Sequence, residues 1–286
     1  MRTFLKWTGS KRLQSDFIID KFPKEIDTYY EPFLGSGSMM MRLLETDIPV
    51  NNIVASDVCE PLIGLWKEVQ TNPQSIIDTY RSLHKEFVKD RKTVFNEVRK
   101  TFNEDKTNYG HFLFLTRTCI NGLIRFNSKG NFNSTCHLTR DGIIPDTLEE
   151  IIWDTHEKIQ RVTFKVQSYD VNTPKEGDLV YLDPPYQNTT KNMYYGGIDL
   201  TKFFEYVINL PCKWLLSFDG LVEDTKVCDI PIPYKKLYYS DGALSTFKKV
   251  QVAEERMIRE ALYTNYEEEE KKDEGVCMWF LGLYRL

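Results

Sequence analysis

Short runs of apolar residues alternate with polar and helical segments along the chain. The runs TYYEPF (28–33) and NNIVASD (51–57) predict two short strands, separated by a glycine turn and the helix start MMMRLLE. From about residue 160 strand patterns return in VTFKVQS, DLVYLD and KWLLSFD (213–219), with helical segments between them. Strands that alternate with helices predict a mostly parallel sheet, which binds ligands where its strands end.

The middle of the chain has a different pattern. Residues 72–120 show helical periodicity and many charges, and GLIRFNSKGNFN (122–133) alternates around a turn signal that predicts a hairpin. We therefore expect one domain made of residues 1–71 and 146–286, with an insertion at 72–145. The final residues GVCMWFLGLYRL predict a last strand or hairpin, and the acidic run EEEE (267–270) predicts an exposed loop or helix end.

Composition narrows the class of protein. A chain of 286 residues with 41% hydrophobic residues suits one large α/β domain, or a core domain with a sizeable insertion. It has no apolar run of about 18 residues, and no apolar signal core follows the basic N-terminus, so we expect neither a membrane span nor secretion. The 6 cysteines form no CxxC pair and the 4 histidines show no metal-ligand spacing, which is typical of a cytoplasmic protein with reduced thiols.

The net charge of −5 is unevenly distributed. The stretch 254–274 holds nine acids and four bases, so the rest of the chain is neutral overall and parts of it are basic. Phosphates bind to local basic patches, so the total charge does not decide whether a chain binds nucleic acid. The basic positions are Arg2, Lys6, Lys11 and Arg12, and several within 81–106. For 81–106 we expect a solvated amphipathic helix, with phosphate contacts by some of its lysines as the alternative.

The first candidate ligand site is EPFLGSGS, in which Gly35 and Gly37 separate a strand from a helix. Glycines at that position let the backbone approach a ligand closely, although the dinucleotide fingerprint would need a third glycine where Met40 stands. Asp57 ends the next strand, where a carboxylate suits the two hydroxyls of a ribose. The two motifs together favour a ligand that contains adenosine, whereas a plain turn and a helix cap remain the simpler alternatives.

The second candidate is the strand end LVYLDPPYQN (179–188). Asp183 would point into the ligand crevice, and Pro184 and Pro185 lack N–H groups and fix the backbone of the turn. A carboxylate beside a backbone carbonyl makes a pair of acceptors for the two hydrogens of a planar amino group. Tyr186 adds a flat face on which a base can stack. The alternative is a turn with a capping acid and a core tyrosine.

Five motifs occur in an order that resembles a known family. They are FLKWTGSK, EPFLGSGS, SDV, RTCINGLIRFNSKGNFN (Arg117–Asn133) and DPPY. The chain resembles the Dam-like (D12 class, α-group) DNA N6-adenine methyltransferases. The resemblance implies an α/β fold with a Rossmann-like class I S-adenosylmethionine-dependent methyltransferase sheet, and an inserted helical and β-hairpin DNA-recognition domain at 72–145. It also implies methyl transfer from S-adenosylmethionine to adenine N6 in double-stranded DNA, with the base flipped out of the duplex.

The resemblance assigns roles to individual residues. The cofactor positions are Trp7, Lys11, Glu31, Phe33, Gly35, Ser36, Gly37, Asp57, Tyr169 and Asp183. The catalytic positions are Asp183, Pro184, Pro185 and Tyr186, and no metal is expected. The DNA-binding positions are Lys6, Asn121, Gly122, Leu123, Arg125, Asn127 and Asn133. Tyr169 stands in a Ser-Tyr-Asp order where the family commonly has an acid followed by an aromatic residue, so Asp170 is not assigned.

Arg125 matches the arginine that reads a base in this family, whose frequent target is GATC. The bacterial enzymes continue after Phe-Asn with an apolar residue and proline, but this chain has Ser134 and Thr135. A phosphate contact remains the alternative for Arg125, and a solvated surface charge for Lys6. Three other functions stay open: a non-catalytic DNA-binding homologue, an amino-methyltransferase acting on RNA or on a protein glutamine, and a Rossmann oxidoreductase. We expect a DNA-associated cytoplasmic protein with no obligatory protein partner.

Overall fold

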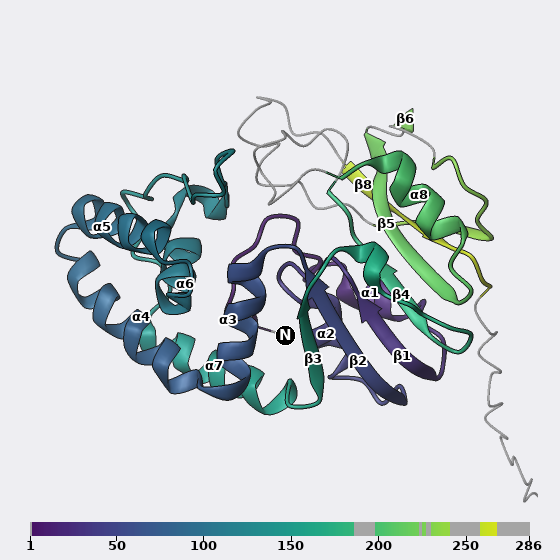
Figure 1. The fold of residues 1–286 in the computed structure, drawn as a ribbon, viewed down its shortest axis with the longest axis horizontal. Coiled ribbons are helices and arrows are strands. Elements are labelled where there is room, and N and C mark those ends of the chain that lie inside the picture. Colours follow the sequence, from purple (N-terminus) through teal and green to yellow (C-terminus); the bar gives the residue numbers. More distant parts are fainter. Residues whose placement is uncertain (1, 186–197, 223–224, 227–229, 241–257, 268–286) are drawn as a thin grey trace, which may run out of the picture.

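The computed structural model describes residues 2–185, 198–222, 225–226, 230–240 and 258–267. Within them the strands form one twisted sheet in the order β3-β2-β1-β4-β5-β8-β7, with β6 paired to β5 (Figure 1). The strands are β1 Ile26–Glu31, β2 Val50–Asp57, β3 Val162–Val166, β4 Leu179–Leu182, β5 Lys213–Val222, β6 Thr225–Lys226, β7 Lys236–Tyr239 and β8 Ile258–Thr264.

The strands β3, β2, β1, β4 and β5 all pair in parallel, whereas β8 pairs antiparallel with β5 and with β7. The order 3-2-1-4-5 is that of a Rossmann sheet, in which the strand order reverses between β1 and β4 and a crevice opens at the strand ends. The expected α/β fold class is therefore confirmed.

Helices cover the sheet and extend beyond it. They are α1 Ser15–Ile19, α2 Ser38–Leu43, α3 Glu60–Thr71, α4 Pro73–Phe87, α5 Arg91–Glu104, α6 Tyr109–Thr118, α7 Pro145–Lys158 and α8 Leu200–Ile208, with 3-10 turns at Ile120–Gly122 and Tyr169–Val171. Figure 1 shows α4, α5 and α6 stacked beyond α3, away from the sheet. Within the described ranges, no helix is both long and apolar enough to cross a membrane.

Aromatic residues join the helical part to the sheet. Trp66 on α3 packs edge-to-face on Phe4 and stacks on Phe164 of β3, with ring centroids 4.7 and 5.6 Å apart. Farther out, Phe102 and Phe112 stack at 5.2 Å within the same buried cluster. The boundaries of the insertion at 72–145 stay a prediction.

Most of the strands expected from the apolar runs are present, with ends within two residues of the pattern in β1 and β2. The hairpin at 122–133 forms a turn closed by an isolated bridge between Phe126 and Phe132, rather than two regular strands. Strand β8 was not expected, because it lies inside the acidic stretch 254–274. The segment GVCMWFLGLYRL lies outside the described residues, as does most of EEEE.

Candidate active site

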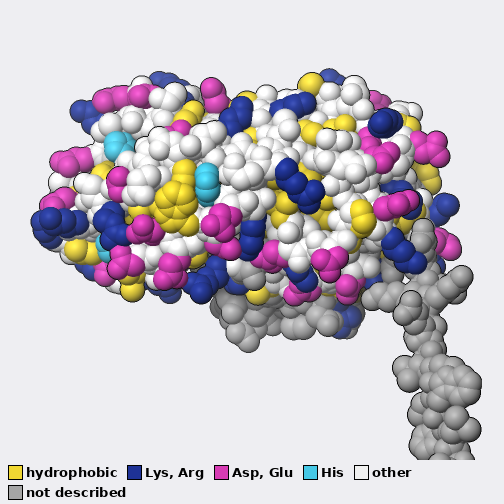
Figure 2. Space-filling model, turned by 90° about the horizontal axis from the view of Figure 1, so that it is seen from below, with side chains coloured by type: hydrophobic (Ala, Val, Ile, Leu, Met, Phe, Trp, Pro, Cys, Tyr) yellow, Lys and Arg dark blue, Asp and Glu magenta, His cyan; other side chains and the backbone are white. Residues whose placement is uncertain are grey.

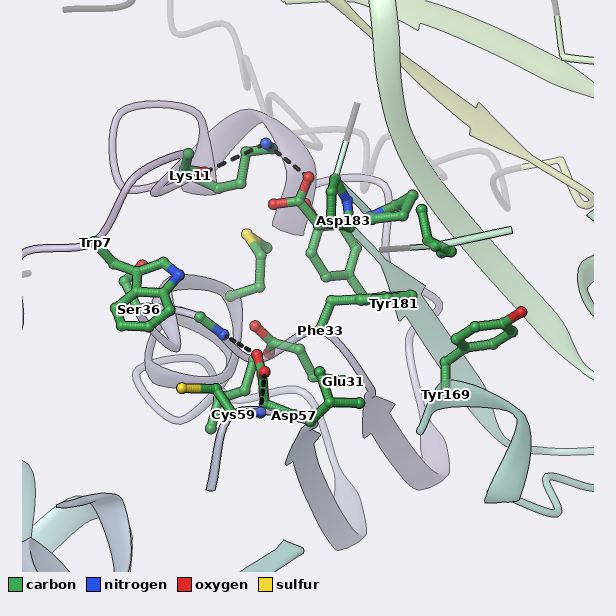
Figure 3. Close-up of a pocket in the computed structure, with 18 of the residues that line it drawn as sticks. Trp7, Lys11, Glu31, Phe33, Ser36, Asp57, Cys59, Tyr169, Tyr181 and Asp183 are labelled. Atoms are coloured by element: carbon green, nitrogen blue, oxygen red, sulfur yellow. Dashed lines mark hydrogen bonds and ion pairs between the residues drawn. The ribbon is translucent and has the colours of Figure 1, made fainter. Parts of the chain in front are cut away.

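A cavity of about 530 Å³ opens at the carboxyl ends of β1, β2 and β4 (Figure 3). Segments far apart in the sequence line it: the N-terminal loop 7–11, the loop after β1, the end of β2, the 3-10 turn at Tyr169 and the turn after β4. Its volume lies in the range of small-molecule and cofactor sites. The structure thus brings the two candidate sites of the sequence into one cavity.

The glycine loop after β1 requires glycine at both positions. Gly35 and Gly37 have φ angles of +47° and +63°, which residues with a side chain rarely adopt. A Cβ on Gly37 would also lie 2.6 Å from Cζ2 of Trp66. Met40, which stands where the dinucleotide fingerprint has its third glycine, is buried in the core.

Asp57 organises this loop from the end of β2. Its Oδ2 accepts a hydrogen bond from the backbone N–H of Gly35 at 3.2 Å, and its Oδ1 accepts one from the N–H of Cys59 at 2.9 Å (Figure 3). Burial raises the pKa of Asp57 to about 6, against the lowering effect of the backbone hydrogen bonds. Asp57 therefore both supports the turn into α3 and lines the cavity, so the capping and ligand roles are compatible.

Ser36 ties the glycine loop to the N-terminal loop. Its hydroxyl lies 3.0 Å from that of Ser10 and 2.8 Å from that of Ser38. Trp7 covers the loop from the same side, since a Cβ on Gly35 would lie 3.0 Å from its Cδ1 atom. Residues 7–11 of the motif FLKWTGSK thus form one wall of the cavity.

Glu31 lies at the end of β1 and is only 3% exposed. The hydroxyl of Tyr29 donates a hydrogen bond to its Oε2 at 2.8 Å. Burial raises the pKa of Glu31 to about 8; hydrogen bonds from Tyr29 and the Met40 backbone oppose the rise, and the charge of Asp183 adds to it. Glu31 is therefore largely protonated near neutral pH, and a cation in the cavity would favour its ionised form.

Asp183 follows β4 and meets Lys11. The Nζ atom of Lys11 lies 2.8 Å from Oδ1 of Asp183 and 3.3 Å from Oε2 of Glu260 on β8. Burial lowers the pKa of Lys11, but the two carboxylates outweigh it and raise that pKa above its usual range. Pro184 and Pro185 line the cavity beside Asp183. Tyr186, the fourth expected catalytic residue, lies outside the described residues.

Aromatic rings form the opposite wall. Phe33 stacks on Tyr169 with centroids 5.5 Å apart and planes 25° apart, and Phe203 packs edge-to-face on both. Asp170 also lines the cavity. The structure therefore places Phe33 and Tyr169 together, as a flat apolar surface for a ring system.

The predicted DNA-binding residues lie in and around the hairpin. Asn121 and Gly122 both have positive φ angles, and a Cβ on Gly122 would meet the Lys6 side chain at 2.4 Å. Burial lowers the pKa of Lys6; Cys119 opposes this, and Arg117 and Arg140 add to it. Lys6 therefore packs directly across the Asn-Gly turn.

The rest of the hairpin holds an exposed arginine on a rigid turn. Oδ1 of Asn127 accepts hydrogen bonds from the N–H groups of Lys129 and Asn131, so this side chain shapes the turn. Leu123 is 9% exposed, whereas Arg125 and Asn133 are exposed. Arg125 is thus the predicted base reader that projects from this hairpin.

Charges on α4 and α5 favour the solvated-helix interpretation of 81–106. Arg81 pairs with Asp146 and Glu149, and Lys89 pairs with Glu86. Figure 2 shows basic and acidic side chains interspersed over the described part of one face of the molecule. Such pairs are typical of a solvated surface.

Comparison with known proteins identifies the family. A profile of the "D12 class N6 adenine-specific DNA methyltransferase" matches residues 7–217. The chain belongs to this family. The Rossmann oxidoreductase alternative is thereby excluded, and the expected resemblance is confirmed.

Relatives named for this activity align over most of the chain. The "Type II methyltransferase M.MjaIII" of Methanocaldococcus jannaschii is 29% identical over 245 residues, which are 76% of this chain and 84% of that protein. A "DNA adenine methylase" of Vibrio cholerae is 33% identical, over 70% of this chain and 72% of the relative. The "Retron Ec67 DNA adenine methylase" of Escherichia coli is 31% identical, over 69% of this chain and 68% of that protein.

Two residues that build the site were not expected from the sequence. Glu260 lies beyond residue 217, where the D12 profile ends, and the only signal of its strand was the short apolar run ALY that follows it. Ser134, noted as a departure from the bacterial pattern, is 3% exposed and hydrogen-bonds the hairpin backbone. Glu260 contacts a segment far away in the sequence, whereas Ser134 acts across its own hairpin.

Proposed function

We propose that this chain transfers a methyl group from S-adenosylmethionine to N6 of adenine in double-stranded DNA. One observation carries the proposal: Asp183 and Pro184 line the same cavity as Asp57 and the glycine loop. A methyl donor held by the loop and an amino group held at Asp183 would therefore share one enclosed space. Proximity of that kind is a large part of what a group-transfer enzyme supplies.

The lining residues suit the parts of S-adenosylmethionine. Asp57 offers carboxylate oxygens for the ribose hydroxyls, and the Phe33–Tyr169 pair offers a flat surface for the adenine ring. Glu31 offers a buried carboxyl that would ionise beside the amino-acid ammonium. When bound, the cofactor supplies an activated methyl group on a sulfonium.

Asp183 and the Pro184 carbonyl would accept the two hydrogens of the adenine amino group. This arrangement draws the nitrogen lone pair out of conjugation with the ring and directs it at the methyl group. Pro184 and Pro185 lack N–H groups and restrict the turn, so the acceptors need little reorganisation. We assign Tyr186 the role of stacking on the flipped base.

The hairpin would recognise the DNA sequence. A guanidinium on an exposed, rigid turn suits a bidentate contact with guanine in the major groove. By resemblance to the family we propose GATC as the target, with Arg125 reading guanine and Lys6, Asn121, Gly122, Leu123 and Asn133 supporting the contact. Asn127 would act through the shape of the turn.

Methylation of defined substrates tests the function. The purified chain is incubated with S-adenosylmethionine labelled in its methyl group and with a duplex containing GATC, the same duplex lacking the site, or an RNA hairpin. N6-methyladenine is then mapped by sequencing. We expect label in the GATC duplex from the wild type and none from Asp183→Ala, which lacks an acceptor for the adenine amino group.

The other outcomes decide between the alternatives. Cofactor and DNA binding without methylation would identify a non-catalytic homologue. Label in the RNA hairpin alone would identify an amino-methyltransferase acting on RNA. Methylation at another duplex sequence would retain the reaction and reject GATC.

A further inference from the structure

The Lys11 ammonium joins three segments of the chain beside the cavity. Its side chain is 5% exposed. Oδ1 of Asp183, Oε2 of Glu260 and the carbonyl oxygen of Gly9 lie 2.8, 3.3 and 3.4 Å from Nζ. The Asp183 carboxylate and the Gly9 carbonyl accept hydrogen bonds from this ammonium. Glu260 lies at ion-pair distance and its Oε2 accepts no hydrogen bond within the described part of the chain, so it attracts the ammonium as a second negative charge.

Glu260 is fixed by its place in the sheet. Its carbonyl oxygen accepts a hydrogen bond from the N–H of Ser240 at 3.0 Å, and its own N–H donates to Oγ of Ser240 at 3.3 Å. The next residues, Ala261 and Leu262, are buried. The backbone beneath the carboxylate is therefore held to Ser240 through both its N–H and its carbonyl group.

The β5 strand bends to admit this segment. The β5–β8 register shifts between Phe218 and Leu221. At Gly220 a Cβ would lie 2.0 Å from the carbonyl oxygen of Arg259, so the two backbones meet more closely than a side chain permits. This close approach sets β8 beside the turn that carries Asp183.

Two carboxylates on one ammonium have a clear physical consequence. A buried lysine with a single carboxylate partner can move together with that carboxylate. A second carboxylate, carried by a strand of the sheet, restrains the position of the ammonium. The raised pKa of Lys11 agrees with the attraction of both acids. Because Lys11 contacts Oδ1 of Asp183, restraining Lys11 also restrains the rotation of the Asp183 carboxylate.

We propose that Glu260 is a positioning residue for methyl transfer, which holds the Lys11 ammonium against Asp183 so that its carboxylate keeps the orientation needed to accept the adenine amino group. This inference rests on the proposed function. Glu260 acts through Lys11 and contacts neither substrate.

The first test is Glu260→Gln, which keeps the size of the side chain and removes its charge. We expect the single-turnover rate at saturating cofactor and DNA to fall about tenfold, because Lys11 loses one of the two carboxylate charges that hold it in place. The dissociation constants for cofactor and duplex should change by less than about threefold. Equal rates for the variant and the wild type would overturn the proposal, as would a change confined to binding.

Glu267→Gln is the matched control. Glu267 follows the end of the same strand, is 69% exposed and lies 3.9 Å from Lys236, so its pair is a solvated one. Its removal should leave the single-turnover rate unchanged. A similar loss in both variants would assign the effect to general charge and reject positioning.

A double-mutant cycle identifies the path of the effect. In a Lys11→Met background, Glu260→Gln should change the rate by less than about twofold, because the residue through which it acts is gone. Full additivity of the two effects would overturn the proposal.

If Glu260→Gln does not fold, two other variants at the same position test the proposal. Glu260→Asp should fold and retain more activity than Glu260→Ala, and equal activity of these two would count against the proposal. A wild type that methylates no duplex would instead reject the proposed function.

Discussion

Ser134 and Arg125 are joined across the hairpin by a hydrogen bond of 2.9 Å, from the backbone N–H of Arg125 to the Ser134 hydroxyl. The same hydroxyl donates to the carbonyl oxygen of Leu123 at 2.6 Å and is buried. The departure from the bacterial pattern at Ser134 therefore fixes the backbone from which an exposed arginine projects.

Arg125→Ala should relax discrimination at one guanine. Loss of a bidentate contact reduces the preference over the wrong base by about 1–3 kcal/mol. The measurement is kcat/KM on duplexes that differ at each position of the target. A uniform loss on all sequences, with a smaller salt dependence, would identify Arg125 as a phosphate contact instead.

Ser134→Ala should destabilise the protein by about 1–3 kcal/mol, because it removes the acceptor for the Arg125 N–H group. It should also weaken sequence discrimination, since the Arg125 backbone is released. Urea unfolding and the same set of duplexes check both effects. Thr135→Ala is the control, because that side chain is exposed; an equal effect of the two changes would contradict the role of Ser134.

Asp57→Asn should weaken cofactor binding by roughly tenfold or more, since the carboxamide offers one acceptor where two N–H groups and a ribose need acceptors. Because burial raises the pKa of Asp57 to about 6, the affinity of the wild-type protein for the cofactor should fall as the pH drops below about 6. Equilibrium titration of the cofactor measures both. Asp170→Asn, at another acid lining the cavity, should change affinity by less than about threefold; the reverse ranking would reassign the ribose contact.

Glu31→Gln should stabilise the cofactor-free protein increasingly as the pH rises. In the folded protein burial raises the pKa of Glu31 to about 8, against 4.5 for an ordinary glutamate. Between these values the folded state keeps a proton that the unfolded state has lost, so this residue reduces stability as the pH rises. Glutamine removes that loss, which amounts to roughly a few kcal/mol.

Urea unfolding from pH 4 to 9 tests this expectation. The difference in the free energy of unfolding between Glu31→Gln and the wild type should grow through this window and level off above about pH 8. A difference independent of pH would show that Glu31 is ionised in the folded protein.

Gly37→Ala should destabilise the protein by roughly 2–4 kcal/mol through the positive φ and the contact with Trp66. Thermal unfolding measures the effect, together with the loss of Trp66 packing in the near-UV circular dichroism spectrum. Gly130→Ala shares a positive φ of 70° in the exposed hairpin, so it separates backbone strain from the clash. Equal losses of stability in the two variants would show that the contact with Trp66 does not contribute.

The cavity follows largely from local patterns. A strand, a glycine turn and a second strand ending in Asp57 are each encoded within a few residues, and parallel strands place their carboxyl ends at one edge. The proline turn at Asp183 belongs to the same edge for the same reason. Hence the sequence alone could predict which motifs meet, although not the distances between their atoms.

The antiparallel end of the sheet was predicted poorly. Strand β8 carries Arg259 and Glu260 in an acidic stretch, and the charges there masked the short run Ala261, Leu262 and Tyr263, which is buried throughout. Its neighbours in the sheet, β5 and β7, supply the burial that makes it a strand. Such burial is a property of the assembled sheet rather than of the segment.

The sequence by itself determined the family and the alternation of strands with helices, and it predicted Asp57, Asp183 and Arg125 as the chemistry-bearing residues. Only the tertiary structure decided that Glu260 meets Lys11 and that Ser134 supports Arg125. The reason is physical: an ion pair or hydrogen bond between segments depends on how the sheet and hairpin pack, and it leaves no periodic signal in either segment.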